Sequence, residues 1–292
     1  MINRNCTILK ENDHYSMKKV LFVFAALVLA FACKPEKNEG PEEIDWDSMG
    51  HQGEFVQVSG DKSGSIGDWS YELLTENGIG ATASFYSNGT FMVNWKDTKT
   101  FMAEQGLDYG IKGDGVDVAS KNYVLDYKFT KSGLKELSYG YVGVHGRIAD
   151  PYVHAEFYIM DSWLTKERPG SWLGPYNAGE YTLDGDTYTV VVNPRLGPAP
   201  YYQNEPGDLG NQWFLQFFAV RKTERTFGTI HISEHFKKWN EMFHGQTVSL
   251  YDKPYTLEVG KPAVLKFQFC GGNAATTTSG SADLTYFKLS HD

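Results

Sequence analysis

The strongest constraint on the fold of this chain is a pair of strand-forming segments separated by a tight-turn sequence. Residues 81–86 read A-T-A-S-F-Y and residues 90–95 read T-F-M-V-N-W, with Ser87-Asn88-Gly89 between them. Asn-Gly between two β-prone segments is the strongest short-range signal for a β-hairpin, because both residues tolerate the positive φ of a tight turn. The pattern therefore predicts antiparallel sheet.

Strand-like segments and turns alternate along most of the chain. Further strands are predicted at residues 123–130, 137–147, 154–161, 179–183, 188–192, 213–222 and 264–269. One helix is predicted near residue 233, with Ser233 as its N-terminal cap and Phe236, Trp239 and Phe243 at helical spacing. About ten strands and one amphipathic helix predict an all-β fold, a two-sheet sandwich in a single domain.

The N-terminal region has the features of an export signal. Met17-Lys18-Lys19 is basic, residues 20–32 are apolar, and Cys33 follows directly after Ala32. This order is typical of a signal peptide whose cleavage exposes a cysteine for lipidation. We expect a signal peptide region at residues 1–32 with its true start at Met17. A lipidated Cys33 and flexible tether would occupy residues 33–52, and the folded domain residues 53–292. The protein would then be secreted and contact a bacterial membrane only through its lipid.

Composition limits the possible partners. The formal net charge is −9 with no basic patch, which argues against nucleic acid as a partner. Aromatic residues make up 15% of the chain, and they suit both strands and sugar rings. With Cys6 and Cys33 outside the folded domain, Cys270 has no disulfide partner. His145 and His154 lack further ligands at zinc spacing, so we expect no metal and no cofactor, and a monomer.

Several motifs occur in the order found in one enzyme family. Residues 155–163, A-E-F-Y-I-M-D-S-W, are similar to L-V-E-Y-Y-I-V-D-S-W, and residues 214–221 are similar to F-x-Q-Y-W-S-V-R. E-R-T-F-G-T-I at 224–230, H-F-K-K-W at 235–239 and S-G-S-A at 279–282 follow in order. From about residue 53 onward the chain thus resembles glycoside hydrolase family eleven, the endo-1,4-β-xylanases. The resemblance implies a jelly roll with a cleft on its concave sheet, and hydrolysis of β-1,4-xylan with retention.

The resemblance also implies roles for individual residues. Glu156 matches the nucleophile, and Tyr158, on the same face of the strand, matches a tyrosine that hydrogen-bonds it. Arg195 matches an arginine whose charge keeps the nucleophile ionised, and Gln216 matches a glutamine of the cleft. Asn94 matches the residue that tunes the acid/base. An ordinary surface or sheet role remains the alternative for each.

The second catalytic carboxylate is missing. Retaining glycosidases need two carboxyl groups about 5–5.5 Å apart. Aligning the glycines of the family's V-E-G-Y with F-C-G-G puts Cys270 at the glutamate, and no Asp or Glu occurs between Lys261 and Ala282. A thiol is a weak hydrogen-bond donor. Glu205 or Asp208 in the loop after Arg195 is a possible replacement.

Aromatic residues of the family's cleft have also changed. Leu74 stands where the family has a stacking tryptophan, and His145-Gly146-Arg147 replaces Y-G-W. Tyr201, Tyr202 and Trp213 could supply a new stacking surface. Three hypotheses stay open: a divergent xylan hydrolase using Glu156, a catalytically impaired glycan-binding surface lipoprotein, and a purely structural β-sandwich.

Overall fold

The computed structural model describes residues 43–110, 115–148, 155–198 and 211–292. Residues 44–292 form one compact unit. The predicted signal peptide and Cys33 lie outside the described residues. Among the described helices, none is long and apolar enough to cross a membrane.

The first sheet contains the hairpin that the Asn-Gly turn predicts. It has six strands in the order β1 (Phe55–Ser59), β4 (Ala81–Tyr86), β5 (Phe91–Thr98), β17 (Thr278–Ser290), β7 (Val124–Lys135) and β13 (Phe227–His231). Phe85 of β4 pairs with Phe91 of β5, and Gly89 between them has a φ of 87°. The hairpin is therefore confirmed, because Gly89 takes up the left-handed conformation of the turn.

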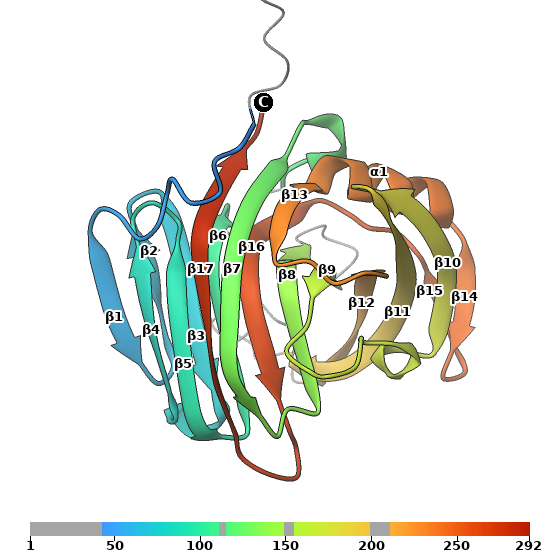
Figure 1. Ribbon diagram of the computed structural model, residues 1–292. Helices are drawn as coiled ribbons and strands as arrows, with labels where there is room; N and C mark the ends of the chain where they lie inside the picture. Colours follow the sequence, from blue (N-terminus) through green and yellow to red (C-terminus); the bar gives the residue numbers. More distant parts are fainter. Residues whose placement is uncertain (1–42, 111–114, 149–154, 199–210) are drawn as a thin grey trace, which may run out of the picture. The chain divides into compact units, whose positions relative to one another are not determined.

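The second sheet has nine strands and carries most of the predicted site residues. Their order is β10 (Tyr176–Leu183), β11 (Asp186–Pro198), β12 (Asn211–Arg221), β9 (Ala155–Ser162), β8 (Tyr139–Ile148), β16 (Pro262–Gly272), β6 (Thr100–Asp108), β3 (Trp69–Thr75) and β2 (Lys62–Ile66). All neighbours are antiparallel except β9 and β12, which run parallel. In Figure 1 the strands β10 to β12 curl round at the right, so this sheet is strongly bent.

Smaller elements complete the described fold. β14 (Thr247–Leu250) and β15 (Lys253–Thr256) form a separate hairpin. Three short 3₁₀ segments are η1 (Glu76–Gly78), η2 (Val118–Ser120) and η3 (Ser171–Leu173). The described residues contain one α-helix, α1 (Ile232–Phe243), so the predicted fold class of a two-sheet jelly roll with a single helix is confirmed.

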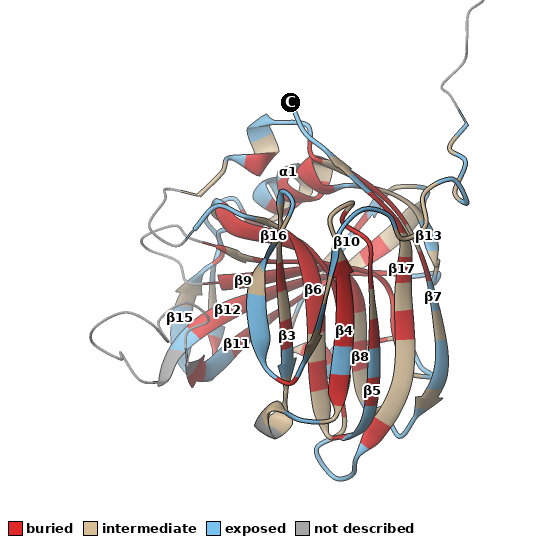
Figure 2. Ribbon diagram, turned by 90° about the vertical axis from the view of Figure 1, so that its left-hand side faces the viewer, coloured by how far each residue is buried: buried red, intermediate tan, exposed pale blue. Residues whose placement is uncertain are grey.

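The core lies between the two sheets and is rich in aromatic side chains. Phe91 of the six-stranded sheet meets Phe269 of the nine-stranded sheet at 5.3 Å between ring centroids, and Phe129 meets Phe269 at 5.4 Å. Figure 2 shows buried residues along the strands of both sheets. Burial of each such side chain stabilises the fold by about 1.5–3 kcal/mol. Cys270 is the free cysteine of the described part, so apolar packing holds these sheets together.

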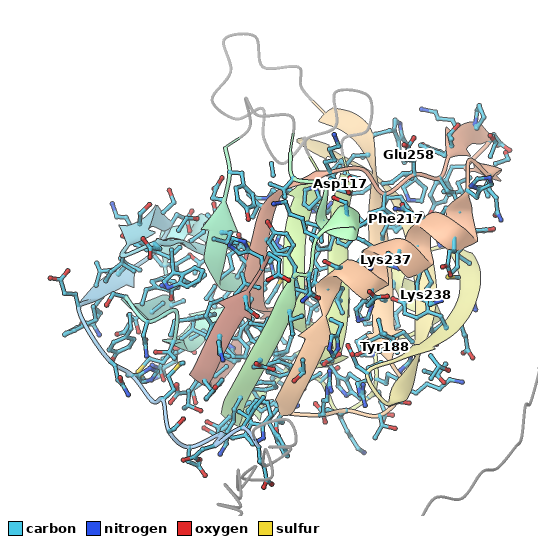
Figure 3. The ribbon with its side chains drawn as sticks, turned by 90° about the horizontal axis from the view of Figure 1, so that it is seen from above. Asp117, Tyr188, Phe217, Lys237, Lys238 and Glu258 are labelled. Atoms are coloured by element: carbon cyan, nitrogen blue, oxygen red, sulfur yellow. The ribbon has the colours of Figure 1, made fainter. Side chains whose placement is uncertain are left out.

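Strand β9 is buried at every position, which means that both of its faces are covered. Phe157 faces the core, where it meets Phe236 of α1 at 4.9 Å. Figure 3 looks down on α1, which carries Lys237 and Lys238 on its surface, with Phe217 of β12 near it. Phe217 and Phe243 of the helix lie 5.2 Å apart. The helix therefore covers the core side of the strand that carries Glu156.

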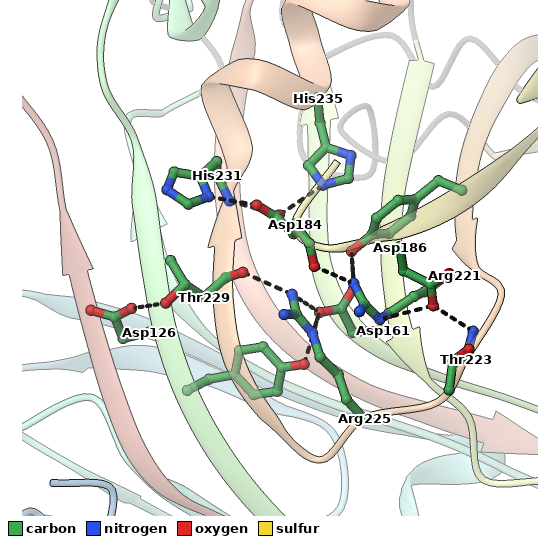
Figure 4. Close-up of polar contacts among 12 residues, drawn as sticks. Asp126, Asp161, Asp184, Asp186, Arg221, Thr223, Arg225, Thr229, His231 and His235 are labelled. Atoms are coloured by element: carbon green, nitrogen blue, oxygen red, sulfur yellow. Dashed lines mark hydrogen bonds and ion pairs between the residues drawn. The ribbon is translucent and has the colours of Figure 1, made fainter. Parts of the chain in front are cut away.

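A buried polar cluster also holds β9 from the core side (Figure 4). Asp161 accepts hydrogen bonds from Tyr188 at 2.6 Å, Tyr127 at 2.8 Å and Arg225 at 2.6 Å. Since Asp161 is five residues from Glu156, it faces the opposite side of the strand. These bonds fix β9 without using the face that carries Glu156.

Two details differ from the sequence prediction. Ser233 is not the N-cap of α1, because it lies inside the helix, donates to the carbonyl of Val118 and accepts from the amide of Tyr123. The compact unit also begins at Ile44. Trp46 packs against Tyr286 at 5.4 Å between ring centroids, within the segment that composition assigns to a tether.

Candidate active site

A cleft of about 610 Å³ opens on the face of the nine-stranded sheet that is turned away from the core. Its walls come from β3, β6, β8, β9, β11, β12, β16 and η3. They include Glu72, Leu74, Met102, Tyr139, Tyr141, His145, Arg147, Glu156, Tyr158, Trp172, Asn193, Arg195, Phe214, Gln216, Phe218, Gln268 and Cys270. Residues far apart in the sequence thus meet on one concave surface.

Glu156 is held in a defined orientation on this surface. One of its oxygens, Oε2, accepts hydrogen bonds from Tyr158 Oη at 3.0 Å and from Gln216 Nε2 at 2.8 Å. Burial, and then the nearby charge of Glu156, raise the pKa of Tyr158 well above its usual value, so its hydroxyl stays a donor. The carboxylate is 8% exposed, which leaves it reachable only from the cleft.

The local strand geometry explains this arrangement. Tyr158 is two residues from Glu156 and therefore shares its face. Gln216 is the direct partner of Glu156 in the parallel pairing of β9 and β12. Asn193 of β11 donates to Gln216 Oε1 at 2.8 Å and so fixes the orientation of the amide. The sequence analysis missed Asn193, although it lies two residues before Arg195 and shares its face of the strand.

Arg195 also lines the cleft, on its more open side. Its positive charge opposes the burial that raises the pKa values of Tyr139, Tyr141 and Cys270. The guanidinium therefore lies within electrostatic reach of the cleft wall that contains Cys270.

Cys270 occupies the wall where the second carboxylate is expected. Its neighbours in the sheet are Met102 on β6 and Tyr141 on β8. Burial, followed by the negative charges of Glu104 and Glu156, raises the pKa of the thiol to about 12. The thiol is therefore uncharged at neutral pH, and it is a weak donor to an ether oxygen.

Glu104 on β6 is a cleft-face carboxylate that the sequence analysis missed. It is fully buried, and its Oε2 accepts from His145 Nδ1 at 2.7 Å and Gln268 Nε2 at 3.0 Å. Lys266 Nζ lies 3.3 Å from Oε1. Burial opposes ionisation, but Lys266 and His145 outweigh it and hold the pKa of Glu104 well below its usual range.

The sequence does contain a signal for the polar side chains around Glu104. Lys266, Gln268 and Cys270 alternate with apolar residues in K-F-Q-F-C, which puts all three on one face of β16. The partner strand β6 was not predicted, so Glu104 had no assigned place.

Aromatic residues at the cleft differ from those expected. Trp172 of η3 is 53% exposed, lines the cleft and stacks near Tyr141 at 6.1 Å between ring centroids. Trp213 was considered as a stacking residue, but it faces away from the cleft and contacts Tyr251 and Lys253 of the β14–β15 hairpin. The accessible tryptophan of the described cleft is therefore Trp172.

Other candidate residues lie away from the cleft or beyond the described part. Asn94 is an exposed residue of β5 in the six-stranded sheet, and it lines a separate hollow with Trp95 and Lys96. Tyr201, Tyr202, Glu205, Asp208 and His154 lie outside the described residues. Within residues 43–110, 115–148, 155–198 and 211–292, no group of three or more His, Cys, Asp or Glu side chains could hold a metal ion.

Comparison with known proteins gives a consistent result. The family described as Glycosyl hydrolases family 11 matches residues 67–252. Endo-1,4-beta-xylanase C of Fibrobacter succinogenes is 37% identical over 215 residues, covering 72% of this chain and 34% of that protein. Endo-1,4-beta-xylanase A of Piromyces sp is 33% identical over 245 residues, covering 82% of this chain and 34% of that protein. The chain thus spans about a third of the length of these relatives.

The fold has a counterpart among solved structures. A crystal structure of a mutant of ENZbleach xylanase superposes with a TM-score of 0.66 at 22% identity, covering 85% of this chain and 90% of that one. At this identity the likeness supports the fold alone.

Proposed function

The chain belongs to glycosyl hydrolase family 11, and from that premise we propose that its cleft hydrolyses β-1,4-xylan or a related plant polysaccharide. Glu156 is the proposed nucleophile. The observation that carries the proposal is the pair of donors, Tyr158 and Gln216, that hold Oε2 of a carboxylate facing the cleft. Among the described residues, no donor occupies the other oxygen, Oε1, which is then free to attack a sugar carbon.

The proposed mechanism is retaining. Glu156 displaces the leaving sugar from the anomeric carbon and forms a covalent glycosyl intermediate, which water then hydrolyses. The exposed ring of Trp172 and the nearby ring of Tyr141 provide apolar faces on which a neutral sugar can stack.

A second candidate function is glycan binding without turnover, by a surface lipoprotein. The observation that favours it is Cys270, because a thiol with a pKa raised to about 12 is a poor proton donor for the leaving group. Loss of general acid assistance costs roughly 10²–10⁴-fold in rate. We also propose that Cys33 carries a lipid after removal of residues 1–32, which would hold the protein at a bacterial membrane.

The test of hydrolysis is reducing-sugar release from xylan by the purified chain and by Glu156→Gln. We expect Glu156→Gln to lower the rate by roughly 10⁴-fold or more, because the amide cannot form the covalent intermediate. Glu241→Gln, an exposed change on α1, serves as the matched control and keeps the full rate.

Two measurements decide between the proposals. NMR of the first products should show the β-anomer, and an α-anomer would contradict the nucleophile role of Glu156. If the unaltered chain releases no sugar from xylan or other β-glucans but is retained on insoluble xylan, the binding function replaces hydrolysis.

A further inference from the structure

A carboxylate–imidazole pair, Glu104 and His145, is built into the wall of the cleft. His145 Nδ1 donates to Glu104 Oε2 at 2.7 Å, and the two side chains are 2% and 0% exposed. Glu104 is ionised at neutral pH, because Lys266 and His145 together outweigh the effect of burial on its pKa. A carboxylate on Nδ1 fixes the orientation of the ring and stabilises the imidazolium when the other nitrogen is protonated.

The other ring nitrogen of His145 has no partner among the described residues. Nε2 is buried from solvent and makes no hydrogen bond, although His145 lines the cleft. A buried polar atom without a partner costs about 1–3 kcal/mol, so such an atom beside a cleft is suited to a ligand. A sugar oxygen becomes its partner when a ligand in the cleft displaces the side chains that cover Nε2.

His145 also stands next to Glu156. In the antiparallel pairing of β8 and β9, His145 is opposite Tyr158, and their rings lie 4.7 Å apart. Glu156 is two residues from Tyr158 on the same face, so His145 and Glu156 are diagonal neighbours. Diagonal pairs in an antiparallel sheet have Cα atoms about 7–8 Å apart, so the two side chains occupy the same part of the cleft face.

We propose that His145 is the proton donor and acceptor of this cleft, with Glu104 as its positioning residue. The proposal rests on the proposed hydrolysis and fills the role for which Cys270 is unsuited. The family resemblance has a tyrosine at this position, so the imidazole is a property of this chain.

The proposed steps balance in atoms and charge. In the first, Glu156 Oε1 forms a bond to the anomeric carbon while the carbon–oxygen bond to the leaving sugar breaks. The imidazolium Nε2–H proton moves to that oxygen, which leaves as a hydroxyl. In the second step, neutral His145 takes a proton from a water molecule that attacks the anomeric carbon, and Glu156 is released as a carboxylate.

Several charged or titratable groups surround the imidazole. They are Glu104 on β6, Lys266 and Cys270 on β16, Tyr158 and Glu156 on β9, and Arg147 on β8.

The decisive variant is His145→Asn in the full chain. The asparagine amide nitrogen replaces Nδ1 and keeps the bond to Glu104, whereas the proton-carrying Nε2 is lost. We expect kcat/KM on xylan to fall by roughly 10²–10⁴-fold. On a dinitrophenyl xylobioside, whose leaving group needs no proton, kcat/KM should fall by less than about tenfold.

Every other outcome contradicts either the role of His145 or the proposed hydrolysis. Equal losses on both substrates, with an unchanged melting temperature, would mean that His145 only shapes the cleft, and full activity would remove it from the mechanism. If the unaltered chain fails on both substrates, the proposed hydrolysis itself is wrong. His291→Asn, at an exposed histidine far along the chain, is the matched control.

Glu104→Gln tests the positioning role. It should reduce kcat/KM on xylan more than on the aryl substrate, because the imidazole loses the carboxylate that fixes its orientation. An equal loss on both substrates would contradict the role. Since Lys266 then loses its partner, the folded state is first checked by circular dichroism, and His145→Gln provides a second test in which Lys266 keeps Glu104.

Discussion

At the scale of single residues, the cleft face of the nine-stranded sheet contains charges that are almost completely buried. Glu104 is 0% exposed and Lys266 3%. An isolated buried charge costs several kcal/mol, and mutual attraction offsets this cost only with good geometry. Here His145 and Gln268 hydrogen-bond to Oε2 of Glu104, and Lys266 forms an ion pair with Oε1 at 3.3 Å. Each member of this cluster therefore depends on the others.

Lys266→Met should destabilise the fold strongly, because it leaves Glu104 buried without its cation. We expect the free energy of unfolding, measured with urea, to decrease by about 3–5 kcal/mol. The double variant Glu104→Gln with Lys266→Met should recover most of this loss. Lys288→Met, at an exposed lysine of β17, is the matched control. Equal stability of Lys266→Met and the unaltered chain would show that the ion pair has no net role.

Residues that belong to a contiguous motif were predictable, and residues defined by strand pairing were not. Glu156 and Tyr158 lie two apart on one strand, so alternation alone puts them on one face. Glu104 acquires its role because β6, β8 and β16 are neighbours in the sheet. The pairing of these strands, separated by many residues, is not encoded in any local pattern. Asn94 is the opposite case, since the resemblance assigned it a role beside the acid/base but it lies on β5, which belongs to the other sheet.

At the scale of elements, a residue from a distant turn binds the residue that precedes helix α1. Asp184 lies in the turn between β10 and β11 with a φ of 51°. Its carboxylate accepts from the amide and the ring of His231, which directly precedes the helix, and lies 3.6 Å from His235 Nε2. A negative charge at a helix N-terminus is favourable. The prediction of Ser233 as the cap was wrong, because the helix begins at Ile232 and the hydroxyl of Ser233 binds the backbone of Val118 and Tyr123 instead.

Asp184 should make stability depend on pH in the acid range. Burial raises the pKa of Asp184, but the adjacent imidazoles of His235 and His231 outweigh it and lower the pKa from 3.8 to about 2. The folded pKa is below the unfolded one, so the stabilisation is present above pH 4 and is lost as the pH falls towards 2. It amounts to roughly 2 kcal/mol.

The measurement is urea unfolding between pH 5 and 2 for the unaltered chain and Asp184→Asn. Asparagine tolerates the positive φ and keeps the size of the side chain. The variant should be less stable at pH 5, and the difference from the unaltered chain should shrink as the pH falls. A difference that stays constant across this range would contradict the assigned role of Asp184.

At the scale of the whole molecule, the cleft and the packing that supports it lie on opposite sides of one sheet. The core side of β9 is fixed by Asp161, Phe236 of α1 and the second sheet, whereas the other side carries Glu156. Residues 44–52 also join the compact unit, through contacts such as His51 with Asp283 at 2.9 Å. The folded unit therefore begins eleven residues after Cys33.

Lipidation at Cys33 can be tested on the whole chain in a bacterial host. We expect the unaltered chain to sediment with membranes and to partition into detergent, and Cys33→Ser to appear in the soluble fraction. Cys6→Ser, a matched change before the proposed start at Met17, should leave membrane association intact. Recovery of Cys33→Ser in the membrane fraction would reject the lipid anchor.

The sequence by itself determined the fold class, the hairpin at Asn88-Gly89, the amphipathic helix and the family, because each depends on local periodicity or on a contiguous motif. Only the tertiary structure decided which side chains meet in the cleft. The parallel pairing of β9 with β12 brings Gln216 to Glu156, and the pairing of β6 with β16 brings Glu104 to Gln268. The neighbours of a strand are set by packing between segments far apart in the chain. The missing glutamate at Cys270 is visible in the sequence, whereas the imidazole proposed to replace it is recognised only once the sheet is assembled.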